Sequence, residues 1–538
     1  MAEERLRRNL DDAFDPGPGF PDALLASRTM AALERADRTA RRRPDMGRRT
    51  GRARPRLSPV LAAALIALLL GLALGGFLAL QHLFRPPEPA KWGSCGGAFQ
   101  CTTVGVPLDY SRPGSGSIDV AVIRQSATDK SHRIGSLVMV AGGPGGSGVD
   151  YLRQNSIYYA NLNRRFDLVA FDQRGSGRSA PVHCLTAAQV DEINDVDTVL
   201  DDPQEKQLFL NSNVAIAEAC QQTSSRLLPF VDTTSAARDM DAIRAALGES
   251  DLTYLAFGYG TYLAQEYAHM FPGHVRAMVL DGVLDPAVAL PDLWLQRAAG
   301  LEASLQAFLA ACRTHIDCTV DQTRVTGFLQ RVDRAPLQVG TRHLGRTLAI
   351  AALLSGLQPR YWTQLEAALH DAFNGDGQAL LGLADLEFGR RSDGSYAFSA
   401  EAWTANLCVD RLVPTDIATY DGLGAAMAQA SATFGPAFQY VASACATWPV
   451  KARTAVGPVT ASTTSPILVV GSTHDPFWPY AGAVAVSSRL AGSVVLTRIG
   501  YGSISYFDSL CVRLAVDDYL TRTQTPARGT TCESDYPA

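Results

Sequence analysis

Residues 252–262 follow the order strand, sharp glycine turn, helix, and the turn at 256–260 reads AFGYG. A turn of this form presents the side chain at its tip above the end of a sheet, where Ser, Cys or Asp can act as a nucleophile. Here the tip is Gly258. Glycine has no side chain that could attack a substrate. The segment therefore has the form of a nucleophile turn without the nucleophile.

Asp475 stands in the position expected for the acid partner of such a nucleophile. It follows an apolar strand pattern at 467–470, which suits the chain order nucleophile, acid, histidine. The histidine should then follow the next strand, at 494–498. All nine histidines lie at or before His474, and the turn at that place reads GYGS and ends at Ser503. The acid is present, whereas the base is replaced.

A glycine-rich loop, GGPGGSG at 142–148, comes directly after another strand pattern. Backbone amides in such a loop can converge on one point and stabilise a developing oxyanion. Gly142 and Gly143, with the amide of Tyr259, are the candidates for this role. A tight turn or a phosphate-binding nest is the alternative interpretation of the loop. A second turn, DQRGSGRS at 172–179, is expected to be structural, with an Asp–Arg pair.

Other side chains could in principle restore the missing chemistry. Ser147, Ser505 and Thr261 lie near these segments in the sequence and carry hydroxyl groups. His474 adjoins Asp475, but a direct neighbour is poorly placed for the usual hydrogen bond between acid and histidine. The sequence favours loss of two of the three catalytic groups over such a rescue.

The elements around these motifs predict an α/β fold with a mainly parallel sheet. Continuous apolar runs of strand length alternate with helical patterns, as expected for strands buried on both faces. The alternation stops at about residue 286 and resumes at about 461, and the interval contains one helical pattern after another. We interpret it as a helical lid. The strand-length runs are Ser136–Ala141, Asp167–Phe171, Leu252–Phe257, Arg276–Leu280, Ile467–Val470 and Val494–Arg498.

Together the motifs resemble the secreted tripeptidyl-aminopeptidase type of serine α/β-hydrolases, close to the prolyl-aminopeptidase family. The resemblance covers roughly residues 90–538 and includes the GGPGGSG loop, the HDP at 474–476 and a C-terminal segment at 511–532. In that family the nucleophile turn reads G-x-S-Y-G and the late turn reads G-x-G-H. The resemblance therefore implies the α/β-hydrolase fold, and it identifies Gly258 and Ser503 as replacements of the nucleophile and the histidine.

The first part of the chain has a different character. Residues 1–57 hold 14 Arg, no Lys and nine acidic residues, although the whole 538-residue chain has a formal net charge of -5. Residues 59–80 then form an uncharged apolar run long enough to cross a bilayer. Arginines before such a run orient the N-terminus toward the cytoplasm, so we expect a signal anchor and an extracytoplasmic main domain. A cleaved signal peptide is the alternative.

All ten cysteines lie beyond this apolar run, which is typical of disulfides formed in an oxidising compartment. No C-x-x-C pair or Cys/His cluster has the spacing of a metal site, and no metal or cofactor is expected. Close spacing suggests two pairs, and the other six cysteines could form three more, although the sequence does not fix this connectivity. The suggested pairs are Cys95 with Cys101, Cys312 with Cys318, Cys184 with Cys220, Cys408 with Cys445 and Cys511 with Cys532.

These expectations divide the chain into six parts and give three functional hypotheses. The first is a catalytically inactive protein of the cell membrane that binds a peptide or small apolar ligand in a pocket lined by Asp475 and the amides near Gly143. The second is an active peptidase with a non-standard nucleophile, and the third is a sensor that acts through its cytoplasmic tail. Nucleic-acid binding is not expected. The parts are 1–57 cytoplasmic tail, 58–82 transmembrane anchor, 83–94 linker, 95–285 hydrolase core, 286–460 helical lid and 461–538 C-terminal part of the core.

Overall fold

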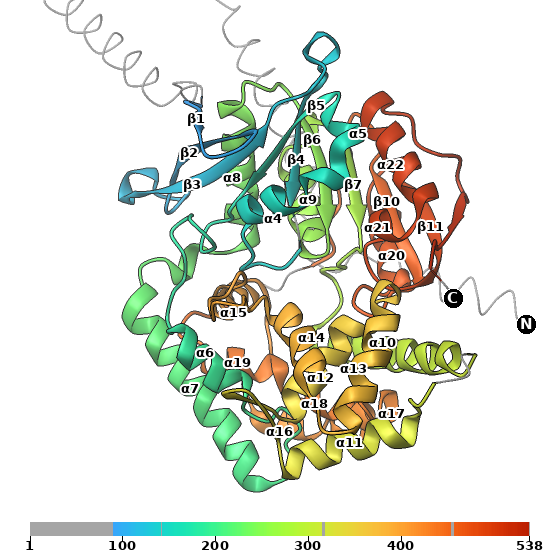
Figure 1. Ribbon diagram of the computed structural model, residues 1–538. Helices are drawn as coiled ribbons and strands as arrows, with labels where there is room; N and C mark the ends of the chain where they lie inside the picture. The colour runs from blue at the N-terminus through green and yellow to red at the C-terminus, as the bar shows by residue number, and fades with distance from the viewer. Residues whose placement is uncertain (1–89, 141, 315–317, 453–456, 537–538) are drawn as a thin grey trace, which may run out of the picture. The chain divides into compact units, whose positions relative to one another are not determined.

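The computed structural model describes residues 90–140, 142–314, 318–452 and 457–536, which lie in one compact unit of the chain (Figure 1). The predicted tail, the apolar run at 59–80 and most of the predicted linker lie outside the described residues. Among the described helices none is long and apolar enough to cross a membrane.

A ten-stranded sheet forms the core, in the order β1-β2-β3-β5-β4-β6-β7-β10-β11-β12. The strands from β5 to β12 run parallel to one another, and β1, β2 and β3 add an antiparallel edge. The strands are β1 (Gly93–Ser94), β2 (Phe99–Pro107), β3 (Ser117–Gln125), β4 (Gly135–Val140), β5 (Phe166–Phe171), β6 (Leu252–Phe257), β7 (Val275–Asp281), β10 (Leu468–His474), β11 (Val494–Tyr501) and β12 (Thr531–Glu533).

Helices cover both faces of this sheet, because its central strands are apolar on both sides. All six residues of each of β4, β5 and β6 are buried. One face packs against α8 (Thr233–Ala246), α9 (Tyr259–Met270) and α20 (Tyr480–Arg489). The other face packs against α4 (Gly148–Asn155), α5 (Ala160–Asn163), α21 (Ser505–Asp508) and α22 (Leu510–Arg522). This is the predicted α/β arrangement with a mainly parallel sheet.

A second layer of helices, here called the helical cap, lies beyond one end of the strands (Figure 1). Within the interval expected to be helical, residues 417–430 form two helices rather than one, because the chain turns between residues 421 and 424. The cap elements after β7 are α10 (Leu290–Cys312), α11 (Gln322–Arg334), β8 (Leu337–Val339), β9 (Arg342–Leu344), α12 (Arg346–Gly356), α13 (Trp362–Phe373), α14 (Gln378–Phe388), α15 (Ala400–Asp410), α16 (Ile417–Asp421), α17 (Gly424–Ala430), α18 (Gly435–Phe438) and α19 (Ala444–Thr447).

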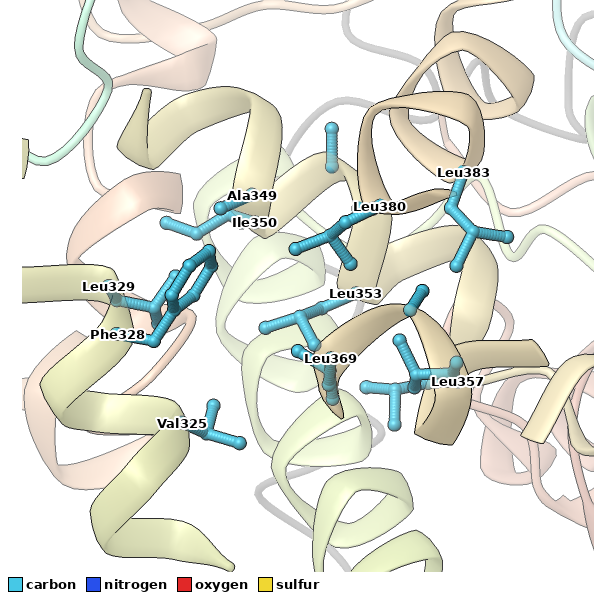
Figure 2. Close-up of a cluster of buried hydrophobic side chains, with 14 of the residues drawn as sticks. Val325, Phe328, Leu329, Ala349, Ile350, Leu353, Leu357, Leu369, Leu380 and Leu383 are labelled. Carbon is cyan, nitrogen blue, oxygen red and sulfur yellow. The ribbon is translucent and has the colours of Figure 1, made fainter. Parts of the chain in front are cut away.

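The helical cap has a hydrophobic core of its own, separate from the clusters that flank the sheet. Figure 2 shows leucines and a phenylalanine from several cap helices meeting in this core, among them Phe328, Leu353, Leu369 and Leu380. Cap residues therefore hold their positions by packing among themselves. The site described below is built between this rigid layer and the ends of the strands.

Two helices from the earlier part of the chain join the helical cap: α6 (Ala187–Asn194) and α7 (Pro203–Ser224). Arg346 at the start of α12 is paired with Asp197 at 2.9 Å and with Asp201 at 2.8 Å, in the segment between α6 and α7. Lys206 of α7 is paired with Asp421 at 2.5 Å. Residues 187–224 thus add a second stretch of chain to the helical segment expected at 286–460.

Five disulfides connect the ten cysteines, and no described cysteine is free. The pairs are those that the spacing suggested: Cys95–Cys101, Cys184–Cys220, Cys312–Cys318, Cys408–Cys445 and Cys511–Cys532. The expectation of a disulfide-bonded protein is confirmed.

Candidate functional site

Gly258 forms the sharp turn between β6 and α9, with φ 55° and ψ -123°. Its amide donates to the carbonyl of Asp281, at the end of the neighbouring strand β7, at 3.1 Å. A residue with a Cβ is strained in this left-handed region, whereas glycine is not. The strand, turn and helix are those of a nucleophile turn, so replacing the nucleophile by glycine preserves the backbone geometry of the site and removes the reactive group.

The space beside Gly258 is occupied by the indole of Trp478. A Cβ added to Gly258 would lie 3.1 Å from Trp478 Cζ2 and 3.5 Å from the Cα of Gly142. A Cβ on Gly282, the residue after β7, would lie 2.9 Å from Trp478 Cδ1. The indole therefore packs against two glycine backbones at the ends of adjacent parallel strands. A side chain at position 258 would require the indole to shift by a few tenths of an ångström.

Asp475 and Ser503 are joined directly, since the Ser503 hydroxyl donates to Asp475 Oδ1. The same carboxylate oxygen accepts the amides of Phe477 and Trp478, each at 2.9 Å. Both Asp475 and Ser503 are buried. The structure thus brings the predicted acid and the predicted base position together. The hydroxyl that takes the place of the histidine satisfies the acid but is not a base at neutral pH.

Ser503 is also held by residues of the helical cap. Its amide donates to Gln358 Oε1 at 2.8 Å, and its carbonyl accepts from Arg360 Nη2 at 3.1 Å. A Cβ on the preceding Gly502 would lie 2.7 Å from Cδ of Pro359. The segment 358–360 therefore packs against the backbone of Gly502 and Ser503.

Burial raises the pKa of Asp475 to about 7, although the Ser503 hydroxyl and the amides of Trp478 and Phe477 lower it. Removing a carboxylate from water disfavours its charged form, and three hydrogen bonds do not offset this effect fully. Behind Asp475, burial also raises the pKa of Asp281 to about 6. Asp475 is thus a carboxyl that changes its charge near neutral pH without a histidine to orient.

The glycine-rich loop lies where an oxyanion site requires it, beside the turn at Gly258. A Cβ on Gly142 would lie 3.3 Å from the carbonyl oxygen of Phe257 and 3.6 Å from the Cα of Gly258. Tyr259 opens α9, and an amide at this position of a helix has no acceptor within the helix. The structure therefore brings Gly142, Gly143 and the amide of Tyr259 to one place, and their role as oxyanion donors stays a prediction.

The hydroxyl groups that could replace the nucleophile are already engaged. Ser147 Oγ donates to Asp172 Oδ1 at 2.7 Å, and Thr261 Oγ1 donates to the carbonyl of Gly258 at 2.6 Å. Ser505 Oγ accepts from the guanidinium of Arg498 at 3.2 Å.

The histidine beside the acid is no better placed. His474 is exposed and stacks on Tyr501, with 4.5 Å between ring centroids. Its ring nitrogen Nδ1 lies 3.0 Å from the hydroxyl of Thr473. No described contact joins His474 to a hydroxyl near Gly258, so the geometry offers no alternative nucleophile–base pair among the described residues.

The second turn, at 172–179, has the structural role that the sequence suggested. Asp172 accepts the amides of Val149 and Arg178 and the hydroxyl of Ser147, and it pairs with Arg178 at 3.4 Å. The buried Arg174 pairs instead with Asp239 of α8 at 2.6 Å. These contacts fix the base of the glycine-rich loop against the sheet.

A cavity of about 180 Å³, here called the cap pocket, lies between this site and the helical cap. Aromatic and leucine side chains form most of its wall, with a few polar groups, as in many small-molecule sites. The expectation that Asp475 would line such a pocket is wrong, because Phe477 and Trp478 stand at the wall instead. Its main lining residues are Gly143, Tyr259, Tyr262, Trp294, Arg297, Phe398, Trp403, Asp410, Arg411, Phe477 and Trp478.

Sequence reasoning missed Trp478, Arg297 and Asp410, three residues that shape this site. Trp478 lies three residues after Asp475, so its size and position could have drawn attention to it. Arg297 lies within a long helical pattern and Asp410 at the end of another, and no local signal distinguishes them from surface charges. Only the tertiary structure brings them to the cap pocket.

Two groups of possible metal ligands occur in the part of the chain that the structure describes, and both are engaged. Cys312 and Cys318 are joined in a disulfide beside Glu366. Asp197 and Asp333 surround the guanidinium of Arg346, together with Glu205. Neither group has the free, convergent ligands of a structural metal site.

The fold and the turn at Gly258 define an α/β-hydrolase. A family model described as TAP-like protein matches residues 430–532. The tripeptidyl aminopeptidase of Streptomyces lividans is 32% identical over 455 residues, which cover 81% of this chain and 83% of that relative. The serine protease Hip1 of Mycobacterium tuberculosis is 31% identical over 481 residues, which cover 83% and 91% respectively.

Among solved structures, the proline iminopeptidase of Mycobacterium smegmatis matches with 15% identity and a TM-score of 0.34, covering 78% of this chain and 98% of that one. The assignment rests on the sequence relatives. The chain belongs to the tripeptidyl aminopeptidase family of α/β-hydrolases, and the resemblance inferred from its motifs is confirmed.

Proposed function

We propose that this protein is a catalytically inactive member of its family that binds a ligand in the cap pocket. The observation that carries the proposal is the contact between Trp478 and Gly258. The position of the nucleophile holds no side chain, and an indole packs so closely against it that a Cβ would lie 3.1 Å from Cζ2 of Trp478. Losing the nucleophile and the base of a serine hydrolase removes roughly a millionfold in turnover.

The acid position supports the same conclusion. Asp475 is retained, but it accepts the hydroxyl of Ser503 in place of a histidine. Cap residues hold the backbone of that serine, because Gln358 accepts its amide and Arg360 donates to its carbonyl. The acid therefore has a partner that cannot act as a base, whereas the cap pocket remains open.

Hydrolysis assays on the natural chain test the proposal. We expect no turnover above background for tripeptidyl p-nitroanilides and p-nitrophenyl esters, and no covalent labelling by a fluorophosphonate. A matched sample that carries Asp475→Ala measures the background. Turnover by the natural chain that the Asp475→Ala change abolishes would falsify the proposal, because it would require a working nucleophile that this carboxyl supports.

We further propose that the described domain is extracytoplasmic and that residues 59–80 anchor it in a membrane. The five disulfides support an oxidising compartment. The apolar run at 59–80 and the arginines before it support an anchor with a cytoplasmic N-terminus. In fractionated cells, the natural chain should remain with the membranes after alkaline carbonate washing. Replacing residues 59–80 by the signal peptide of a secreted protein should release the domain, and its continued retention would contradict the anchor.

A further inference from the structure

The cap pocket contains an arginine with unused hydrogen-bond donors. Arg297 of α10 donates from Nε to the carbonyl of Phe477 at 2.9 Å. Neither of its terminal amino groups has a hydrogen-bond partner among the described residues, and no described carboxylate lies within ion-pair distance of it. Since Arg297 lines the pocket, these amino groups are available to whatever enters it.

The faces of the Arg297 guanidinium are already in use. Its central carbon lies 4.7 Å from the ring centroid of Trp294 and 4.5 Å from that of Trp478. Cation–π contacts with two indoles hold the guanidinium in a fixed orientation. A guanidinium held in this way interacts through its edge, where two parallel N–H groups match the two oxygens of a carboxylate.

The Trp294 indole supplies a second donor without an acceptor. Its Nε1 is buried and has no hydrogen-bond partner within the described part of the chain. Buried donors in native proteins are nearly always satisfied, by protein, water or ligand. The Trp294 N–H is thus an unsatisfied donor beside Arg297, whose terminal amino groups also lack acceptors among the described residues.

The charge balance of the cap pocket also favours an anion. Arg411 lines the pocket too, and among the described residues it has no carboxylate within ion-pair distance. Burial lowers the pKa of Arg297 to about 10, so this side chain remains charged at neutral pH. Burial raises the pKa of Asp410, the one carboxyl among the lining residues, to about 7. At neutral pH two arginines and one partly protonated carboxyl therefore line the pocket, while Asp475 and Glu387 act on Arg297 from beyond ion-pair distance.

Asp410 is poorly placed to reverse this preference by binding an amine. Its two oxygens already accept the amide of Thr233 at 2.9 Å and the hydroxyl of the same threonine. That hydroxyl also contacts the phenol of Tyr259. The carboxyl of Asp410 thus belongs to an internal network, whereas the donors of Arg297 do not.

We propose that the cap pocket binds a small organic acid, whose carboxylate pairs with the edge of Arg297 and whose apolar group packs against Trp294, Trp403 and Phe398. The volume of about 180 Å³ suits an apolar group of one aromatic ring or a short acyl chain, since a cavity of roughly 150 Å³ admits benzene. This inference rests on the proposed binding function and adds the chemical class of the ligand.

Three ligands of one shape but different charge test the inference on the full-length chain. They are 3-phenylpropionate, its neutral amide 3-phenylpropionamide, and the cation 3-phenylpropylamine. Trp294, Trp403 and Trp478 line the pocket, so their fluorescence reports binding directly. We expect the carboxylate to bind at least tenfold more tightly than the amide. We also expect Arg297→Gln to remove this difference and Arg297→Lys to keep part of it.

Equal affinity for carboxylate and amide, strongest binding of the amine, or no fluorescence change with any of the three overturns the inference. So does a preference for the carboxylate that persists in a folded Arg297→Gln protein. The comparison of the three ligands on the natural chain gives an answer even if the variant does not fold. The proposed function fails separately, by Asp475-dependent hydrolysis in the natural chain, whatever the three ligands show.

Discussion

The indole of Trp478 and the backbone of Gly258 are in contact, so that a single methyl group added to Gly258 would lie 3.1 Å from Cζ2 of the indole. Trp478 is also tied to the retained acid, because its amide donates to Asp475 Oδ1 at 2.9 Å. One residue therefore links the carboxyl that remains of a catalytic triad to the position that has lost its nucleophile. Under the proposed loss of catalysis, Trp478 is therefore a third position to examine beside Gly258 and Ser503.

This relationship predicts that restoring two residues is not enough for activity. The variant Gly258→Ser with Ser503→His should stay near background, because the indole of Trp478 lies against position 258, where even a Cβ would be 3.1 Å from it. Adding Trp478→Ala should raise hydrolysis of a tripeptidyl p-nitroanilide by about 10²-fold or more, as expected for a serine that gains its base. Fluorophosphonate labelling of the introduced serine gives a second measurement.

The matched control adds Trp403→Ala instead of Trp478→Ala. Trp403 lines the same pocket but is not among the residues that a Cβ on Gly258 would meet. The change Trp403→Ala therefore enlarges the cavity without removing the indole beside position 258, and it should leave the double variant inactive. If the double variant is already active, or if both tryptophan changes activate it equally, then Trp478 does not block this position.

The same contact predicts a coupling in stability between Gly258 and Trp478. Gly258→Ala should lower the free energy of unfolding by about 3 kcal/mol, from backbone strain and from the clash with the indole. In a Trp478→Ala background the destabilisation caused by Gly258→Ala should be smaller by about 1–2 kcal/mol, since only the backbone strain remains. Urea denaturation of the four proteins measures this coupling.

Gly340→Ala is the control for strain alone. Gly340 also has a positive φ, of 61°, but a Cβ there would meet nothing within 4 Å. The loss in the free energy of unfolding caused by Gly340→Ala should be the same with and without Trp478→Ala. If Gly258→Ala is coupled to Trp478→Ala no more strongly than Gly340→Ala is, then the contact between Gly258 and Trp478 does not affect stability.

The hydrogen bond between Ser503 and Asp475 predicts a pH-dependent effect of Ser503→Ala. The hydroxyl lowers the pKa of Asp475 against the larger effect of burial, which raises it to about 7. Because the folded pKa lies above the unfolded value of about 3.8, the native state binds more protons between these limits, and stability falls as pH rises through this window. Removing the hydroxyl enlarges the penalty on the charged form.

We therefore expect Ser503→Ala to lower the free energy of unfolding by about 1.5–3 kcal/mol at pH 8 and by about 1 kcal/mol at pH 5.5. Ser395→Ala is the control, because Ser395 makes the same kind of bond to Asp393 on the surface. It should change stability by less than about 0.5 kcal/mol at either pH. Urea titrations at the two pH values decide the matter, and a larger effect at pH 5.5 would contradict the assignment.

The disulfides predict a stability order set by loop length. Cys408–Cys445 closes a separation of 37 residues and Cys95–Cys101 one of 6. In the chain-entropy model their loss costs about 4 and about 2 kcal/mol respectively. The paired change Cys408→Ser and Cys445→Ser should therefore lower the Tm more than Cys95→Ser and Cys101→Ser. It should also weaken ligand binding, since α15 carries Trp403 of the cap pocket.

Much of the fold could be predicted because its strands are buried on both faces. The run Leu252–Phe257 is a strand with the same bounds in the structure, and the interval expected to be helical contains the helices of the cap. The antiparallel hairpin of β2 and β3 was missed. β2 reads FQCTTVGVP, with exposed and half-buried residues among the apolar ones, because this part of the sheet lies at its edge.

The candidate site could be located from the sequence but not completed. Motif spacing identified Gly258, Asp475 and Ser503, because the ends of parallel strands meet at one edge of the sheet. The side chains that fill the site come from the helical cap, or from a loop whose direction the sequence does not give. The contacts of Trp478 with Gly258 and Arg297 depend on how α10 lies over the strands, which is a tertiary property.

The charges around the cap pocket predict that a carboxylate ligand binds more tightly as pH falls. Burial raises the pKa of Asp410 to about 7 against the hydrogen bonds from Thr233, with nearby Asp232 raising it and Arg411 lowering it. Asp475, which influences Arg297 electrostatically, has a pKa near the same value. Both carboxyls lose charge between pH 8 and pH 6, whereas the arginines do not.

An organic acid such as 3-phenylpropionate stays ionised over this range, so only the protein changes its charge. Its affinity should rise by roughly threefold to tenfold from pH 8 to pH 6, as one nearby negative charge is neutralised. Asp410→Asn, which lacks the charge at both pH values, should bind more tightly at pH 8 and show a smaller change with pH. The neutral amide should bind equally at both values. A carboxylate affinity that falls toward pH 6 would mean that the ligand pairs with a group other than Arg297, because the charge of Arg297 is constant over this range.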